Sequence, residues 1–239
     1  MKIAVCPDFV FSSSNELSEL NNFGIDWNLN PYRLPLLKDE ISYLLNTIKI
    51  KRGDLEIRFC CSDLKVDIFH SDEKIANMSL SILKSCIDYI GKLGGGYFTI
   101  RPQLFSGTFW DYAVKNLKEL VEYGNANGVI VCIENTSGGI LSNPKRFREL
   151  LEKTGAMATV DIFIDEESSE SLNFLKTVSD KIVNVHLHGG VSCQNNLDTV
   201  LDALLNTDCA WLSVDISEID ESKPARELLS CFLKEKGCV

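Results

Sequence analysis

The sequence lacks the features that mark several common protein classes. No apolar run approaches the roughly 18 residues that a membrane-spanning helix needs. No glycine-rich phosphate-binding loop of the GxGxxG or GxxxxGK type is present, which argues against nucleotide binding. Glycine- or proline-rich linkers, repeats and low-complexity tracts are also missing, so we expect one domain over residues 1–239. The first residues turn polar at Pro7 and Asp8, before the apolar region of a signal peptide could form, so we expect a cytoplasmic protein.

Positive charge is also scarce. The chain has 24 Lys and Arg against 34 Asp and Glu, which gives a formal net charge of −10 at pH 7. Neutralising phosphates requires clustered Lys and Arg, so nucleic acid is not an expected partner. The nine cysteines are an odd number spread over strand-like and helix-like segments. They do not form a disulfide pattern, and reduced thiols in a cytosol explain them more simply.

Short apolar runs alternate with helical patterns along the whole chain. Such alternation, with nearly continuous apolar strands, predicts a parallel sheet covered by helices. Eight strand–helix units in one domain favour an α/β fold of the TIM barrel type, a single (β/α)8 barrel with a parallel eight-stranded closed sheet. The strand candidates are residues 3–6, 24–29, 55–61, 97–101, 129–134, 157–161, 183–188 and 211–215.

Several helices have recognisable ends or faces. Residues 38–50 and 72–93 have the apolar spacing of amphipathic helices, and Met78 is predicted to lie on the apolar stripe of the second. Asn143 followed by Pro144 predicts a helix start, because asparagine caps helices and proline fits the first helical position.

The last four strand candidates end in side chains that bind metals or transfer protons. These side chains are Glu134, Asp161, His186 and Asp215. Each residue alone has an ordinary explanation, because strand ends are often polar. In a barrel, however, active sites lie at the carboxyl ends of the strands, so the four would converge there. Three carboxylates held close together need a balancing cation, which predicts a bound divalent metal.

Further residues are candidates for substrate contact. His188 shares a face with His186, because strand side chains repeat every two residues, and it is the candidate for second-layer or substrate contact. Arg101 could hold a substrate phosphate or carboxylate, or could form a salt bridge to a carboxylate such as Glu134. Trp27 could line a sugar pocket, although core packing is the default explanation for a tryptophan.

Short motifs at these strand ends resemble the xylose-isomerase-like barrel superfamily, which includes sugar-phosphate isomerases and epimerases, inosose dehydratases and abasic-site endonucleases. In the ketose epimerases of this superfamily a Glu, Asp, His, Glu set binds one divalent ion. The resemblance therefore implies a metal site of Glu134, Asp161, His186 and Asp215, with Glu134 and Asp215 as the catalytic acid/base pair. Mn²⁺, Mg²⁺ or Co²⁺ would suit this oxygen-rich site, and Zn²⁺ is an alternative. The motifs are residues 133–135, 160–161, 185–188 and 212–215.

The sequence also departs from the family pattern. Asp215 stands where the family usually has glutamate, Ile164 replaces a usual histidine, and Arg101 precedes Pro102 where His-Pro is common. The additional histidines and carboxylates of a trinuclear zinc site are missing, so abasic-site endonuclease activity is not expected.

Three interpretations follow from the resemblance. The first is a metal-dependent sugar or sugar-phosphate isomerase or epimerase of carbohydrate metabolism, which abstracts a proton next to a carbonyl through a metal-stabilised enediolate. The second is an inosose-dehydratase-like lyase, and the third is a catalytically eroded barrel that acts as a binding protein. The expected partner is a small sugar or polyol, without nucleic acid or membrane, and a homo-oligomer is compatible with the sequence.

Overall fold

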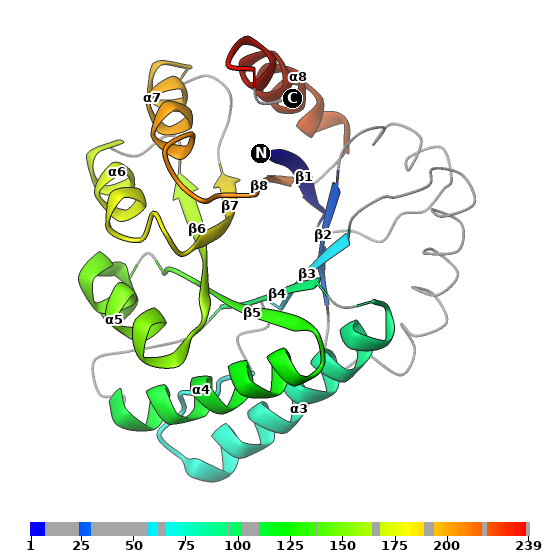
Figure 1. Ribbon diagram of the computed structural model, residues 1–239, viewed down its shortest axis with the longest axis vertical. Helices are drawn as coiled ribbons and strands as arrows, with labels where there is room; N and C mark the ends of the chain where they lie inside the picture. Colours follow the sequence, from blue (N-terminus) through cyan, green and yellow to red (C-terminus); the bar gives the residue numbers. More distant parts are fainter. Residues whose placement is uncertain are drawn as a thin grey trace.

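The computed structural model is a barrel of eight parallel strands, and the predicted (β/α)8 fold is confirmed. Neighbouring strands pair in chain order, and β8 closes the ring by pairing with β1 from Lys2–Trp211 to Pro7–Ile216. The strands form the centre of the molecule in Figure 1. They are β1 (Lys2–Pro7), β2 (Gly24–Asn28), β3 (Ile57–Cys61), β4 (Gly96–Ile100), β5 (Val129–Glu134), β6 (Met157–Phe163), β7 (Ile182–His188) and β8 (Trp211–Ile216).

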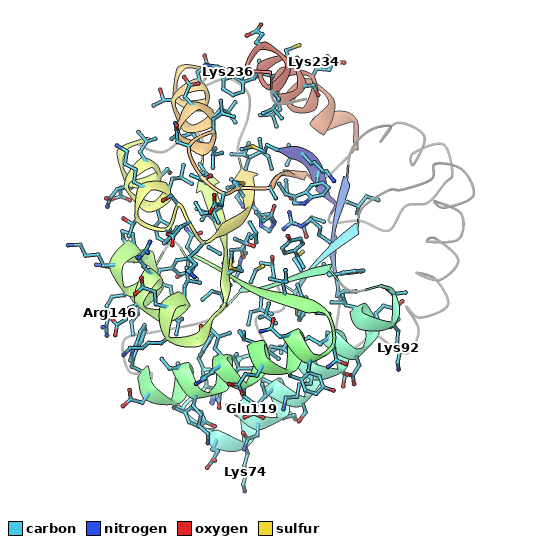
Figure 2. The ribbon with its side chains drawn as sticks, viewed as in Figure 1. Lys74, Lys92, Glu119, Arg146, Lys234 and Lys236 are labelled. Carbon is cyan, nitrogen blue, oxygen red and sulfur yellow. The ribbon has the colours of Figure 1, made fainter. Side chains whose placement is uncertain are left out.

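The helices run around the outside of the strands in chain order (Figure 1). They are α3 (Glu73–Lys92), α4 (Trp110–Ala126), α5 (Pro144–Thr154), α6 (Ser168–Thr177), α7 (Gln194–Leu204) and α8 (Ile219–Glu235), with a 3-10 turn, η2 (Ile140–Ser142). Charged side chains such as Lys74, Lys92 and Arg146 project outward from this ring (Figure 2). Among the described helices, none is both long and apolar enough to span a membrane.

The structure describes residues 1–7, 24–29, 57–61, 66–94, 96–101, 110–136, 138–163, 168–188, 194–216 and 219–237. Some side chains within these ranges are not described, and Trp27 and Asp215 are among them. The predicted helix over residues 38–50 lies outside the described residues.

Helix α5 begins where the sequence predicts. The side chain of Asn143 accepts hydrogen bonds from the backbone N–H groups of Lys145 and Arg146, at 3.0 and 3.2 Å. Pro144 takes the first helical position, where its missing N–H costs nothing. The helix ends at Gly155, whose left-handed backbone (φ 76°) closes the last turn. These local signals define the β5–α5–β6 unit that carries two of the candidate site residues.

The predicted stripe of α3 is wrong at Met78, which is 59% exposed. The predicted stripe is right at Cys86 and Ile90, which are fully buried, and the helix also buries Leu80, Leu83 and Ile87 against the barrel. Met78 lies two positions before Leu80, so it points about 200° away around the helix axis. The correct stripe follows the i, i+3, i+7, i+10 spacing that starts at Leu80.

The two faces of the barrel wall differ in polarity. Side chains alternate across a strand, and apolar residues such as Phe98, Val131 and Val185 face the helices, fully or almost fully buried. The opposite positions hold buried polar groups, including Thr99 and Thr159, whose hydroxyls lie 2.7 Å apart across the barrel from β4 to β6. The barrel interior is therefore a polar layer, and it leads up to the candidate site.

Buried cysteines are expected to be chemically inert. Burial raises the pKa of the Cys132 and Cys209 thiols to about 12, whereas Cys231 is exposed. The thiolate is the reactive form, so Ellman's reagent at pH 8 should label Cys132 only after unfolding. Because the folded-state pKa is raised, the stabilisation from these thiols is complete below pH about 9 and is lost as pH rises toward 12.

The labelling experiment compares Cys231→Ser with Cys132→Ser. The first substitution should remove one equivalent of fast labelling in the native protein. The second should remove one equivalent only from the denatured total. Loss of a fast equivalent in Cys132→Ser would contradict the burial of this thiol.

Candidate active site

Glu134, Asp161, His186 and His188 meet at the carboxyl end of the barrel. Glu134 ends β5, Asp161 lies in β6, and both histidines lie in β7. In the sheet register, Asp161 pairs with His186. Glu134 pairs with Thr159, which precedes Asp161 by two residues on β6 and lies on the same face of the strand. Three neighbouring strands therefore bring together three of the four predicted ligands, as the sequence predicts.

His186 is the centre of this group. Its Nδ1 lies 2.6 Å from Glu134 Oε1 and 3.3 Å from Asp161 Oδ1, and its Nε2 lies 3.0 Å from Asp26 Oδ2 on β2. Burial alone would lower the pKa of His186, but hydrogen bonds to the three carboxylates raise that pKa well above its ordinary value. The surrounding carboxylates therefore favour the protonated form of the ring.

The two rim carboxylates differ in acidity. Burial raises the pKa of Glu134, and the neighbouring Asp161 charge adds to the rise, although His186 opposes it. Burial also acts to raise the pKa of Asp161, but hydrogen bonds from His186 and His188 outweigh it, and the pKa falls well below the usual range. Of these two adjacent carboxylates, Glu134 is therefore the one that takes up a proton more readily.

Three side chains have the geometry of a metal site. Candidate ligand atoms of Asp161, His186 and His188 all lie within 4.8 Å of one another. Asp161 Oδ1 is buried and lies 3.3 Å from His186 Nδ1 and 3.2 Å from His188 Nε2. A divalent cation between these atoms would satisfy the oxygen, so the residues fit a metal. His188, predicted to make a second-layer or substrate contact, is thus also a candidate ligand.

Arg101 forms the salt bridge that was one of its two predicted roles. Its Nε donates to Glu134 Oε2 at 2.5 Å, and its Nη2 donates to Asp161 Oδ2 at 2.9 Å. Its side chain is still 34% exposed, so the guanidinium borders the solvent side of the rim. Arg101 also supplies positive charge to the carboxylates, so the sequence argument that only a bound cation could balance them was incomplete.

A polar cluster below the rim was missed by the sequence analysis. Arg58 Nη1 donates to Asn184 Oδ1 at 2.9 Å, and Asn184 Nδ2 donates to Asp26 Oδ2 at 2.7 Å. Ser213 Oγ lies 3.1 Å from both acceptors. Burial alone would raise the pKa of Asp26, but His186 and Arg58 hold it well below its usual range. The two-residue strand period could have found Asn184, which precedes His186 by two positions.

The other predicted residues are placed only by their backbones. Asp215 lies in β8 and pairs with Cys6, two positions beyond the Ser213 that pairs with His186. Trp27 lies in β2 and pairs with Phe59. The side chains of Asp215 and Trp27 are outside the described part of the structure, so their catalytic, metal and substrate roles stay predictions.

Comparison with known families agrees with this architecture. The model of the xylose isomerase-like TIM barrel family matches residues 21–235. The chain belongs to the xylose isomerase-like TIM barrel family. An uncharacterized protein of Methanocaldococcus jannaschii is 29% identical over 168 residues, which cover 65% of this chain and 74% of that protein. A probable endonuclease 4 of Thermotoga sp. (strain RQ2) is 28% identical over 142 residues, 55% of this chain and 49% of the relative, so the match spans about half of that protein.

Solved structures of the xylose isomerase-like fold superpose over nearly the whole chain. A D-tagatose 3-epimerase-like protein has a TM-score of 0.74 at 18% identity and covers 98% of this chain and 97% of its own. A 3-keto-D-glucoside 4-epimerase from E. coli has a TM-score of 0.73 at 14% identity and covers 96% and 98%. At such low identity these likenesses establish the fold, and the predicted family is confirmed.

Proposed function

We propose that this chain is a divalent-metal-dependent isomerase or epimerase that acts on a sugar or sugar phosphate. The observation that carries the proposal is the cluster of Asp161, His186 and His188, with ligand atoms within 4.8 Å, beside the buried Glu134. This cluster lies at the barrel end where enzymes of this fold react with their substrates. The epimerases among the structural neighbours support the same reaction class.

The proposed ligands are Glu134, Asp161, His186 and Asp215, with His188 as a further ligand or a substrate contact. Manganese, magnesium or cobalt suits these donors, and zinc is an alternative. When bound, the ion would act as a Lewis acid toward the substrate carbonyl. Glu134 accepts the proton from the neighbouring carbon, and Asp215 returns a proton on the opposite face. Arg101, bonded to Glu134 Oε2 and 34% exposed, borders the space for the substrate.

Other activities are supported less well. The probable endonuclease 4 relative raises the question of DNA cleavage, but the net charge of −10 opposes binding to phosphate backbones. Within the described residues, one group of three metal-binding side chains is close enough to hold an ion, which suits a single-metal reaction. A lyase acting on an inosose-like ring would use the same proton abstraction, and an eroded binding protein would use neither metal nor Glu134.

The proposal is tested by incubation in D₂O with Mn²⁺ and a panel of ketoses, aldoses, their phosphates and inososes. We expect an isomer or epimer that carries one deuterium next to the carbonyl, because the proton that Asp215 returns to the carbon has exchanged with solvent. Glu134→Gln should lower the rate by about 100-fold or more, the usual contribution of a positioned base. The matched control is Glu119→Gln on α4, an exposed residue on the outside of the barrel (Figure 2) that pairs with Lys84.

Product mass separates the alternatives. A product lighter by one water indicates the lyase. Absence of deuterium exchange and of any product across the panel, in the presence of Mn²⁺, contradicts the proposal and favours the binding-protein interpretation.

A further inference from the structure

The orientation of the Asn184 amide is set by a buried arginine. Arg58 is 2% exposed, and its guanidinium lies over the rings of Tyr97 and Trp211, at 5.0 and 5.3 Å from the ring centres. Arginine only donates hydrogen bonds, so the Asn184 atom 2.9 Å from Arg58 Nη1 must be the amide oxygen. The amide nitrogen of Asn184 is therefore turned to the other side.

That nitrogen points to Asp26, which is completely buried on β2. Asn184 Nδ2 donates to Asp26 Oδ2 at 2.7 Å, and His186 Nε2 lies 3.0 Å from the same oxygen. An ionised carboxylate only accepts, so a lone pair on Nε2 would face the lone pairs of Asp26. His186 therefore donates an Nε2–H to Asp26. The 3.0 Å separation between Asn184 Nδ2 and His186 Nε2 reflects two donors that share one acceptor.

We infer that Asp26 is a positioning residue that fixes the ring of His186 through Nε2, so that Nδ1 is the nitrogen available to a metal. This inference rests on the metal site proposed above. The Nδ1 atom faces Glu134 Oε1 and Asp161 Oδ1, whereas Nε2 faces the interior of the barrel. The relay from Arg58 through Asn184 to Asp26 sets both the tautomer and the tilt of the ring.

The effect of such a carboxylate partner on metal affinity can be stated in magnitude. A histidine ligand whose second N–H is bound to a carboxylate is better oriented and more basic, and loss of this partner typically costs 10–100-fold in metal affinity. Asp26→Leu removes the acceptor while roughly keeping the volume. Asp26→Asn keeps a neutral oxygen that can accept from Nε2, so it should recover part of the lost affinity.

The test combines Zn²⁺ titration with nitrogen-15 NMR of the histidine rings. The chain has three histidines, so His186 can be assigned by comparison with His70→Ala and His188→Ala. In the Zn²⁺-loaded parent we expect Zn²⁺ on Nδ1 and a proton on Nε2. In Asp26→Leu we expect affinity about 10–100-fold weaker and loss of the protected Nε2–H signal.

The matched control is Thr99→Val, which removes the hydrogen bond between Thr99 and Thr159 in the same barrel interior, whereas the described polar contacts of His186 go to Asn184, Glu134, Asp161 and Asp26. This variant should keep the Zn²⁺ affinity and the His186 spectrum of the parent. If Asp26→Leu acted only through a general loss of packing, Thr99→Val would change both as well.

Three outcomes would overturn the inference. Binding of Zn²⁺ through Nε2 of His186 in the parent overturns the inference, even if Asp26→Leu fails to fold. Equal affinity and an unchanged His186 spectrum in Asp26→Leu overturn the inference alone and leave the proposed metal site intact. No Zn²⁺ binding by the parent overturns both the proposed site and the role of Asp26.

Discussion

Replacing His186 by alanine is expected to weaken binding of Co²⁺ or Mn²⁺ by more than about 100-fold, beyond the cost of losing an outer-layer partner. The reason is geometric, because His186 Nδ1 lies 2.6 Å from Glu134 and 3.3 Å from Asp161 at the centre of the cluster. Without this nitrogen the two carboxylates keep oxygen atoms for the ion but lose the ligand between them. Titration with Co²⁺, followed by visible absorption and calorimetry, measures the change.

The control for this prediction is His70→Ala. His70 precedes α3, where its Nδ1 accepts a hydrogen bond from the backbone N–H of Asp72 at 3.0 Å. The substitution His70→Ala removes one histidine without changing the cluster of Asp161, His186 and His188. Equal Co²⁺ affinity in the parent and in His186→Ala would show that the cluster does not hold the ion.

Replacing Arg101 by glutamine is expected to strengthen metal binding by about tenfold or more, which corresponds to about 1.4 kcal/mol. The guanidinium shares Glu134 and Asp161 with the proposed ion, and the two cations repel each other. Unit charges 4 Å apart near a protein surface interact by about 4 kcal/mol, and the 34% exposure of Arg101 reduces that value through solvent screening. Glutamine keeps a hydrogen-bond donor but removes the charge.

The same substitution should destabilise the metal-free protein. Glu134 and Asp161 would lose their Arg101 partner and keep, among the described residues, only histidine partners while they remain almost completely buried, and removing one partner of a buried charge is costly. We therefore expect a lower Tm without metal and a larger rise in Tm when Mn²⁺ is added, measured by calorimetry.

Arg148→Gln is the matched control for Arg101→Gln. Arg148 bridges Glu152 and Asp180 on the outside of the molecule, at 2.8 and 2.7 Å, and these partners are 53% exposed. Its loss should leave metal affinity unchanged. Weaker metal binding in Arg101→Gln would mean that Arg101 orients the ligands and does not compete with the ion.

The fold and the convergence of the residues on β5, β6 and β7 were predictable, because the sequence signals for helix ends and strands are local. The cap at Asn143, the stop at Gly155 and the apolar strands are each read within a few residues. Strand order in a barrel then follows the chain, so residues at successive strand ends, such as Glu134, Asp161 and His186, necessarily meet.

The interior network was not predictable in this way, because its contacts join distant segments. Asp26 and His186 are 160 positions apart, and Arg58 and Asn184 are 126 positions apart. Their pairing depends on which strands face each other across the closed barrel and at what height, which no local pattern encodes. Arg101 illustrates the same limit. Its position at the end of a strand is compatible both with a salt bridge to a neighbouring carboxylate and with binding of a substrate anion.

Metal content tests the central claim most directly. The purified parent, incubated with Mn²⁺ and dialysed, would be measured by elemental analysis beside Glu134→Gln and His186→Ala. We predict about one divalent ion per chain in the parent and loss of that ion in both variants, since each removes a proposed ligand. A parent that holds no divalent ion after this treatment would contradict the account and leave the barrel as a binding scaffold.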